Sequence, residues 1–386
     1  MRGFLRQKAN LWLLAWPAGF LMYCTARADT DIAEKVYAGG VFRAYGTVMS
    51  FVSGIFPFSL AEQLLILFPF LIIALLIRGI IRIIRSGRSG SPDIGIVRIV
   101  RIAEMFRTLL AVAGVLFLMF MMGAGTNYYR REFADISGLK AYIRESSTEE
   151  LYEMCLELSQ KAGEAGKAAD GETAGQYHTD GAAGSVRAFD ISMTGQKARE
   201  AMESLSERIP VLKGYYNKPK AVFFSEFMSR FNITGVYFPW TVEANINVDV
   251  PEYTLGATMC HELSHLRGFM REDEANFIGY LACTGSESSS LQYSGYMMAL
   301  LYASNRLYGD SRELYRELYS TYTDDMIRDL REYSEYWKKY EDTAFSEAGE
   351  KMNNAYLKAN NQSDGTKSYG RMVDLLLADY RAKRSD

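Results

Sequence analysis

The chain has 386 residues, of which 48% are hydrophobic and 23% are charged, and this composition excludes a disordered protein. A formal net charge of −3 gives no pull toward nucleic acid, and a mean hydropathy of −0.11 is that of a soluble protein. These averages hide two unlike parts. Residues 1–127 hold 13 of the 43 Lys and Arg and 6 of the 46 Asp and Glu, a net charge of +7, so the remainder carries −10. A basic, apolar third joined to an acidic, tyrosine-rich two thirds excludes a simple cytosolic enzyme.

Three apolar segments in the basic part are each predicted to form a membrane-spanning helix. They cover residues 9–26, 60–77 and 108–124, and their lengths fall in the range of about 17 to 25 residues that a span requires. The first segment has an alternative interpretation as a signal peptide. It follows three basic residues, and Ala26-Arg27-Ala28 resembles a cleavage site.

The loop between the second and third segments is strongly basic. It carries seven arginines against Asp93 and Glu104, namely Arg78, Arg82, Arg85, Arg88, Arg98, Arg101 and Arg107. Basic loops stay in the cytoplasm, so we expect a multi-pass protein of the plasma membrane with a cytoplasmic N-terminus. Residues 1–127 would be the anchor, and residues 128–386 would form an extracytoplasmic domain. The lipid bilayer is then a partner, and a nucleic acid is not.

Residues 128–386 are expected to be mainly helical with a small β-sheet, an α+β class. Strands are predicted at 221–224, 236–238 and 243–250. The last of these alternates apolar and polar residues, which indicates a half-exposed edge strand that an extended peptide could join. Residues 161–185 contain six Gly and predict a flexible insertion, with His178 as a solvated loop residue.

The run His261-Glu262-Leu263-Ser264-His265 is an HExxH pattern. Residues four apart share one face of a helix, so His261 and His265 can hold one zinc ion. Glu262 is then placed to act as general base toward a water molecule at that ion. The chain has only three His, and two of them lie in this pattern.

Catalytic zinc usually has three protein ligands, so a third must follow. Gly268 matches a metzincin spacing, but Arg271 stands where that pattern needs His, which excludes the metzincin arrangement. Glu272, Asp273 and Glu274 are the next candidates. Glu274 shares a helical face with Ile278 and Leu281, whereas Glu272 shares one with Gly279, so Glu274 is the preferred ligand.

The segment HELSHLRGFMREDEANFIGYLAC at 261–283 resembles the domain-of-unknown-function 3810 (DUF3810) family of bacterial membrane proteins, as do residues 234–247 and 356–380. That family is similar to gluzincin-type zinc metallopeptidases, which use HExxH and a Glu. The resemblance implies a zincin-like domain with His261, His265 and Glu274 as ligands and Glu262 as base. Glu274-Ala-Asn is also similar to the third-ligand segment of ImmA/IrrE-type peptidases. No particular substrate is implied.

A hydrolase also needs a donor for the oxyanion of its intermediate. Tyr369 is the first candidate, and Tyr293, Tyr356 and Arg371 are alternatives. The four cysteines, Cys24, Cys155, Cys260 and Cys283, are interpreted as buried apolar residues, and helical rise disfavours a Cys260–Cys283 disulfide.

Together these patterns predict a membrane-anchored zinc metallopeptidase that cuts a peptide or protein near the membrane. Two alternatives stay open. One is a non-enzymatic sensor or scaffold with a structural zinc, in which Glu262 has no role. The other is a hydrolase of a non-peptide amide in the cell envelope.

Overall fold

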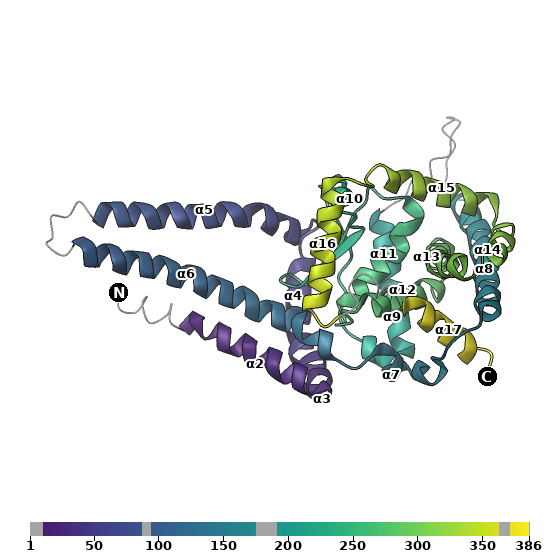
Figure 1. The fold of residues 1–386 in the computed structure, drawn as a ribbon, viewed down its shortest axis with the longest axis horizontal. Coiled ribbons are helices and arrows are strands. Elements are labelled where there is room, and N and C mark those ends of the chain that lie inside the picture. The colour runs from purple at the N-terminus through teal and green to yellow at the C-terminus, as the bar shows by residue number, and fades with distance from the viewer. Residues whose placement is uncertain (1–10, 87–93, 175–190, 363–370, 386) are drawn as a thin grey trace.

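The computed structural model describes residues 11–86, 94–174, 191–362 and 371–385. In these ranges the chain is mainly helical with one three-stranded sheet, which confirms the α+β class. Figure 1 shows two unlike regions: long helices that project to one side, and a rounded helical body that holds the sheet.

Helices α5 (Leu60–Ser86) and α6 (Ile94–Gly123) pack side by side and project from the body. Within the described ranges, these two helices are long and apolar enough to cross a membrane, over Leu60–Arg85 and Gly95–Gly123. The segment predicted as the first span forms α2 (Ala15–Ala28), which packs along α6. Its 14 residues are fewer than the roughly 17 that a bilayer requires, so the prediction of three spans is supported for two segments.

The sheet has the order β1-β3-β2, with β1 at Lys220–Ala221, β2 at Gly235–Phe238 and β3 at Glu243–Ile246. Strand β3 is parallel to β1 and antiparallel to β2. All four residues of β3 are buried. The prediction of an edge strand at 243–250 is therefore wrong, because β3 is the central strand and β2 lies at an edge.

The polar residues of β3 are buried because they have partners inside the protein. The Glu243 carboxylate lies 2.5 Å from Lys220 Nζ and accepts hydrogen bonds from the backbone N–H groups of Leu60 (3.1 Å) and Ala61 (2.9 Å). Asn245 Oδ1 accepts from the Ser59 hydroxyl at 2.6 Å. The sheet thus caps the first turn of α5 and joins the two regions.

The body is built around α11 (Glu252–His265), α12 (Glu272–Thr284) and α13 (Ser289–Asp310), packed against α8 (Thr148–Ala174) and α9 (Ile191–Arg208). Helix α8 corrects the prediction of a flexible insertion at 161–185, because helix continues to Ala174; residues 175–185, with His178, lie outside the described ranges. Gly166 is a packing residue, since a Cβ there would lie 3.2 Å from the Tyr293 ring.

Shorter elements complete the fold and are given by their bounds. They are α3 (Thr30–Ile32), the π-helix η1 (Ala33–Phe42), α4 (Arg43–Gly54), the 3₁₀ helices η2 (Gly125–Tyr129), η3 (Leu139–Tyr142) and η4 (Pro210–Leu212), α7 (Phe133–Ser137), α10 (Ser225–Arg230), α14 (Arg312–Tyr319), α15 (Asp324–Lys338), α16 (Ala344–Ala359) and α17 (Met372–Ala382). Helix α16 stands at the side of the body from which α5 and α6 project (Figure 1).

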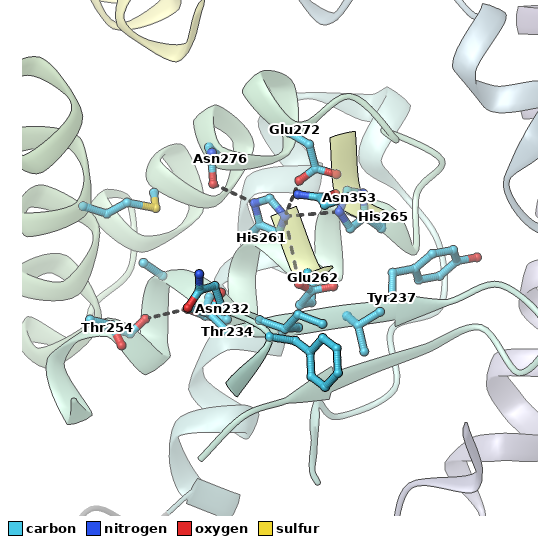
Figure 2. A pocket seen from close by; sticks show the side chains of 18 of the residues that line it. Asn232, Thr234, Tyr237, Thr254, His261, Glu262, His265, Glu272, Asn276 and Asn353 are labelled. Carbon is cyan, nitrogen blue, oxygen red and sulfur yellow. Dashed lines mark hydrogen bonds and ion pairs between the residues drawn. The ribbon is translucent and has the colours of Figure 1, made fainter. Parts of the chain in front are cut away.

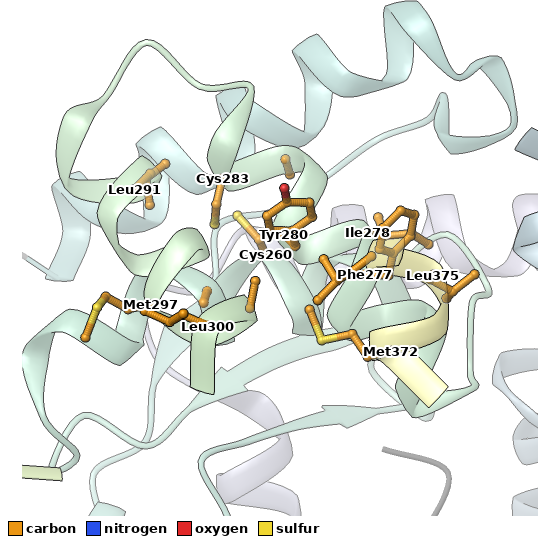
Figure 3. Packing of buried hydrophobic residues seen from close by; sticks show 14 of the residues in the cluster. Cys260, Phe277, Ile278, Tyr280, Cys283, Leu291, Met297, Leu300, Met372 and Leu375 are labelled. Carbon is orange, nitrogen blue, oxygen red and sulfur yellow. The ribbon is translucent and has the colours of Figure 1, made fainter. Parts of the chain in front are cut away.

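Part of the apolar core lies between α11, α12, α13 and α17 (Figure 3), and the core continues to α8, α9 and β3. Cys260 of α11 and Cys283 of α12 lie close together in this core, and both are buried free thiols that form no disulfide. Cys155 is buried too, but Cys24 is exposed, so the prediction that all four cysteines are buried is wrong for Cys24. A short distance along α11 from this apolar packing, the same helix carries the HExxH residues.

Candidate metal centre

Helix α11 places His261 and His265 one turn apart, with their Nε2 atoms 3.2 Å from each other (Figure 2). Two ligands of a tetrahedral zinc with Zn–N distances of about 2.0–2.1 Å lie roughly 3.3 Å apart. The two imidazoles therefore already have the spacing that a shared zinc ion requires.

Each imidazole is oriented through its other nitrogen. His261 Nδ1 lies 2.7 Å from Asn276 Oδ1, and His265 Nδ1 lies 2.6 Å from the backbone oxygen of Phe269. Both oxygens are acceptors, so in the neutral form of each imidazole Nδ1 carries the proton and Nε2 presents a lone pair. Outer partners of this kind fix the tautomer of metal-binding histidines.

Glu272 completes the group. Its Oε2 lies 3.3 Å from His261 Nε2, and ligand atoms from His261, His265 and Glu272 all lie within 4.8 Å of one another. The distance of 3.3 Å between Glu272 Oε2 and His261 Nε2 also matches the spacing of two ligands in a tetrahedral zinc site. Two imidazoles and one carboxylate are a donor set that suits catalytic zinc, so the residues fit the metal.

Glu274, the ligand preferred from the sequence, is not part of this group. Its carboxylate accepts hydrogen bonds from the backbone N–H of Phe133 at 2.7 Å and from Arg271 at 3.0 Å. Burial raises its pKa, although Arg271 opposes the shift. Glu274 therefore faces α7 and holds it in place.

The preference for Glu274 rested on taking Gly279 to mark an outer face of α12. A Cβ at Gly279 would lie 3.0 Å from the backbone nitrogen of His261, so this face is the one closest to α11. Glu272 and Asn276 lie on that same face, and both reach His261. A glycine marking a close helix approach is the signal in the sequence that identifies Glu272.

Glu262 is buried beside the group, with Oε1 4.0 Å from His261 Nε2. A Cβ at Gly235 would lie 2.6 Å from Oε1, so the glycine of β2 makes room for this carboxylate. Oε2 is buried without a hydrogen-bond partner among the described residues. Burial raises the pKa of Glu262 to about 8. A carboxyl group with a raised pKa and an unpartnered oxygen is suited to accepting a proton.

The two histidines differ in their metal-free protonation. Burial opposes the charged form of His261, but contact with Glu272 outweighs it and raises the pKa to about 9. Burial, with the nearby His261, lowers the pKa of His265 to about 4. Since metal binding needs neutral imidazoles, a metal ion bound here would displace a proton from His261.

These groups open onto one cavity of about 650 Å³ (Figure 2). Its walls come from β2, α11, α13 and α16, together with Phe120 of α6. This volume lies within the range of about 300–1,000 Å³ that is usual for ligand sites.

The predicted oxyanion donors are scattered. Tyr369 lies outside the described ranges. The Tyr293 hydroxyl donates to Asp329 at 2.7 Å, and Arg371 donates to Asp273 at 2.9 Å. Only Tyr356 among the alternatives lines the cavity, where its hydroxyl accepts a hydrogen bond from Tyr128 at 2.9 Å.

Tyr302 is a cavity residue that the sequence analysis missed. Its hydroxyl lies 3.4 Å from Asn276 Nδ2, next to the amide that orients His261. No local pattern distinguishes it among the 26 tyrosines of the chain, because its position depends on how α13 packs.

Fold and site together define a helical protein with two candidate spans and a possible binding group for one metal ion. The chain belongs to the family described as "Protein of unknown function (DUF3810)", whose model matches residues 37–377. This confirms the resemblance found in the sequence. No curated protein and no solved structure matches the chain.

Proposed function

We propose that the chain is a membrane-anchored, zinc-dependent peptidase. The observation that carries the proposal is the convergence of His261, His265 and Glu272 beside the unpartnered oxygen of Glu262, at the wall of one cavity. Structural zinc sites are closed by four protein ligands. The three ligating groups found among the described residues leave a position open, which favours catalysis over a scaffold.

Zinc bound here would supply Lewis-acid polarisation of a water molecule and of the substrate carbonyl. The residues of the chain carry the remaining steps. Glu262 takes the proton of the attacking water and passes it to the nitrogen of the leaving amine. Asn276 and the backbone oxygen of Phe269 hold the imidazoles in place while this happens. Tyr302 and Tyr356 are two of the cavity hydroxyls, and in this proposal they donate to the oxyanion.

The substrate is an extended peptide in this proposal. Among the described residues β2 pairs only with β3, so one edge of Gly235–Phe238 is free for strand addition. The same strand lines the cavity and contacts Glu262 through Gly235. A peptide added to β2 would therefore pass the metal group.

The body is placed outside the cytoplasm in this proposal. The arginines at the distal ends of α5 and α6 favour a cytoplasmic side for those ends, and the body lies at the opposite ends of both helices (Figure 1). If α5 and α6 are the two segments that cross the membrane, the side on which the N-terminus lies depends on the path of α2. A reporter fused after Asn127 should be active only outside the cytoplasm, and activity confined to the cytoplasm would reverse the orientation.

The test of the peptidase function is Glu262→Gln. Purified wild type should bind one zinc per chain and cleave members of a fluorogenic peptide library. The variant should keep its zinc but lose about 10²- to 10⁴-fold in kcat, because the base is gone while the shape is kept.

The matched control is Glu207→Gln, at a carboxylate with 73% exposed side chain, which should leave both zinc content and cleavage unchanged. Equal cleavage by wild type and Glu262→Gln would refute the mechanism. Stoichiometric zinc without cleavage of any library member would favour the scaffold.

A further inference from the structure

The cavity shares a wall with a candidate span. Trp240 and Phe120 both line it, and their rings lie 6.1 Å apart. Trp240 Nε1 donates to the backbone oxygen of Leu116 in α6 at 3.0 Å. Leu116 lies seven residues before Gly123, the last residue of α6, which is about 10 Å along the helix axis. The wall of the cavity therefore extends beside the apolar part of α6.

The turn between β2 and β3 is fixed in this position by further contacts. The Tyr237 hydroxyl donates to the backbone oxygen of Gly123 at 2.8 Å, and the Tyr45 hydroxyl donates to that of Pro239 at 3.1 Å. A Cβ at Gly123 would lie only 2.3 Å from the Pro239 oxygen. The cavity thus has a defined place relative to the end of α6.

A second apolar feature lies beside the other candidate span. Phe223, Phe224 and Phe227 are 85%, 53% and 58% exposed, and we call them the aromatic face. The backbone N–H groups of Phe223 and Phe224 donate to the Glu62 carboxylate at 3.1 and 2.9 Å. Glu62 is in the first turn of α5, so the aromatic face is held at the point where that helix leaves the body.

The cavity rim carries exposed apolar side chains as well. Met352 of α16 lines the cavity and is 67% exposed, and Phe345 of the same helix is 48% exposed. Figure 1 shows α16 on the side of the body that faces α5 and α6. Burying a Phe or Met side chain is favourable by about 1.5–3 kcal/mol, so this side of the body is poorly suited to water.

Resting on the peptidase function proposed above, we propose that the aromatic face lies in the bilayer surface and that the cavity takes polypeptides anchored in the same membrane. The occupant is lipid rather than a protein, because the face is continuous with the start of α5, whose spanning window has no buried residue. A cavity bordered by α6 receives chains that leave the bilayer beside it. Cleavage is then expected close to the anchor of the substrate.

The position of the aromatic face can be tested without any activity. In vesicles of phosphatidylcholine brominated on the acyl chains, the emission that Phe223→Trp adds to wild type should be quenched. Tyr308→Trp is the matched control, since Tyr308 is 47% exposed on α13, which lies away from the candidate spans (Figure 1). Equal quenching of the two variants, or none in either, would overturn the membrane contact.

The substrate class is tested with one library peptide made with and without a palmitoyl chain. Wild type in vesicles should cleave the anchored form more efficiently by about 10²-fold, because the shared membrane raises its effective concentration. The variant Phe223→Ser/Phe224→Ser/Phe227→Ser should lose about tenfold on the anchored form through misplacement of the cavity, and less than about twofold on the free form. The control variant Tyr308→Ser should leave the cleavage of both the anchored and the free peptide unchanged.

Equal cleavage of anchored and free peptide by wild type would overturn the substrate class while the peptidase function stands. Quenching of Phe223→Trp without cleavage of either peptide would refute the peptidase function and the substrate class together, while it supports the membrane contact. The two proposals therefore fail in different ways.

Discussion

Two helix pairs in this molecule each approach closely at a glycine, but one pair has an apolar outer surface and the other has polar side chains inside the body. In α5–α6, a Cβ at Gly79 would lie 2.7 Å from Met105 Sδ, and in α11–α12 one at Gly279 would lie 3.0 Å from the His261 nitrogen. The outer surface of α5 is apolar, with Leu71 and Ile73 more than half exposed. The α11–α12 pair instead has polar side chains inside the body.

The difference identifies the surroundings of each pair. Exposed aliphatic side chains along a whole helix mark a surface that is covered by lipid or by another protein. Buried carboxylates and imidazoles are costly unless they are paired or bind a ligand. The surface of the first pair therefore suits a membrane, and the buried polar groups of the second are hydrogen-bonded and include a group that could hold a metal ion.

The largest expected effect comes from removing the cation of the buried pair beneath the cap on α5. The Lys220 and Glu243 side chains are only 6% and 0% exposed, so Lys220→Met leaves the buried Glu243 carboxylate without a counter-ion, held only by the N–H groups of Leu60 and Ala61. We expect a loss of about 3–5 kcal/mol in the free energy of unfolding, measured by denaturant titration in detergent.

Lys35→Met is the matched control, because its partner Asp31 is 48% exposed. Pairs at the surface contribute less than about 1 kcal/mol. Similar losses in the two variants would mean that the buried Lys220–Glu243 pair contributes no more than a surface pair.

The next effect separates the two glutamates of α12. Glu272→Ala should weaken zinc affinity by at least about 100-fold, more than the loss of an orienting partner, as measured by competition with a chelator. Glu274→Ala should keep zinc affinity. It should lose about 1–3 kcal/mol of stability, because the Phe133 N–H and Arg271 lose their acceptor. The reverse pattern of zinc loss would restore Glu274 as the ligand.

The smallest effect tests the close approach of α11 and α12. Gly279→Ala should reduce stability by about 1–3 kcal/mol, since its Cβ meets backbone rather than a movable side chain. At Gly309, in α13, nothing lies within 4 Å of a Cβ, so Gly309→Ala should stabilise by about 0.5–1 kcal/mol. Thermal unfolding of both variants decides this, and a neutral Gly279→Ala would show that the helices can separate freely.

The sequence analysis succeeded where chemistry depends on local spacing. His261 and His265 are one helical turn apart in any α-helix, so their convergence follows from the chain alone. The choice between Glu272 and Glu274 depends on which face of α12 meets α11, and that is a property of packing. Gly279 carries this information only when it is taken as a contact residue.

The other wrong predictions have the same cause. The alternation in β3 was taken to mean one wet face, but Glu243 and Asn245 are satisfied by Lys220, Ser59 and the first turn of α5. Gly163 and Gly166 were taken to mean a loop, but both lie in α8, where a Cβ would be 3.2 Å from Thr323 and Tyr293 respectively. Except for Lys220, the partners lie more than a hundred residues away in the chain, so periodicity cannot identify them.

The cap on α5 has a consequence for the order of events during synthesis. The N–H groups of Leu60 and Ala61 donate to the carboxylate of Glu243, which lies 183 and 182 residues later in the chain. Chains emerge from the ribosome amino end first, so α5 and α6 are complete long before β3 exists. Until then the first N–H groups of α5 lack this acceptor. The cap on α5 can therefore form only after β3 has been synthesised.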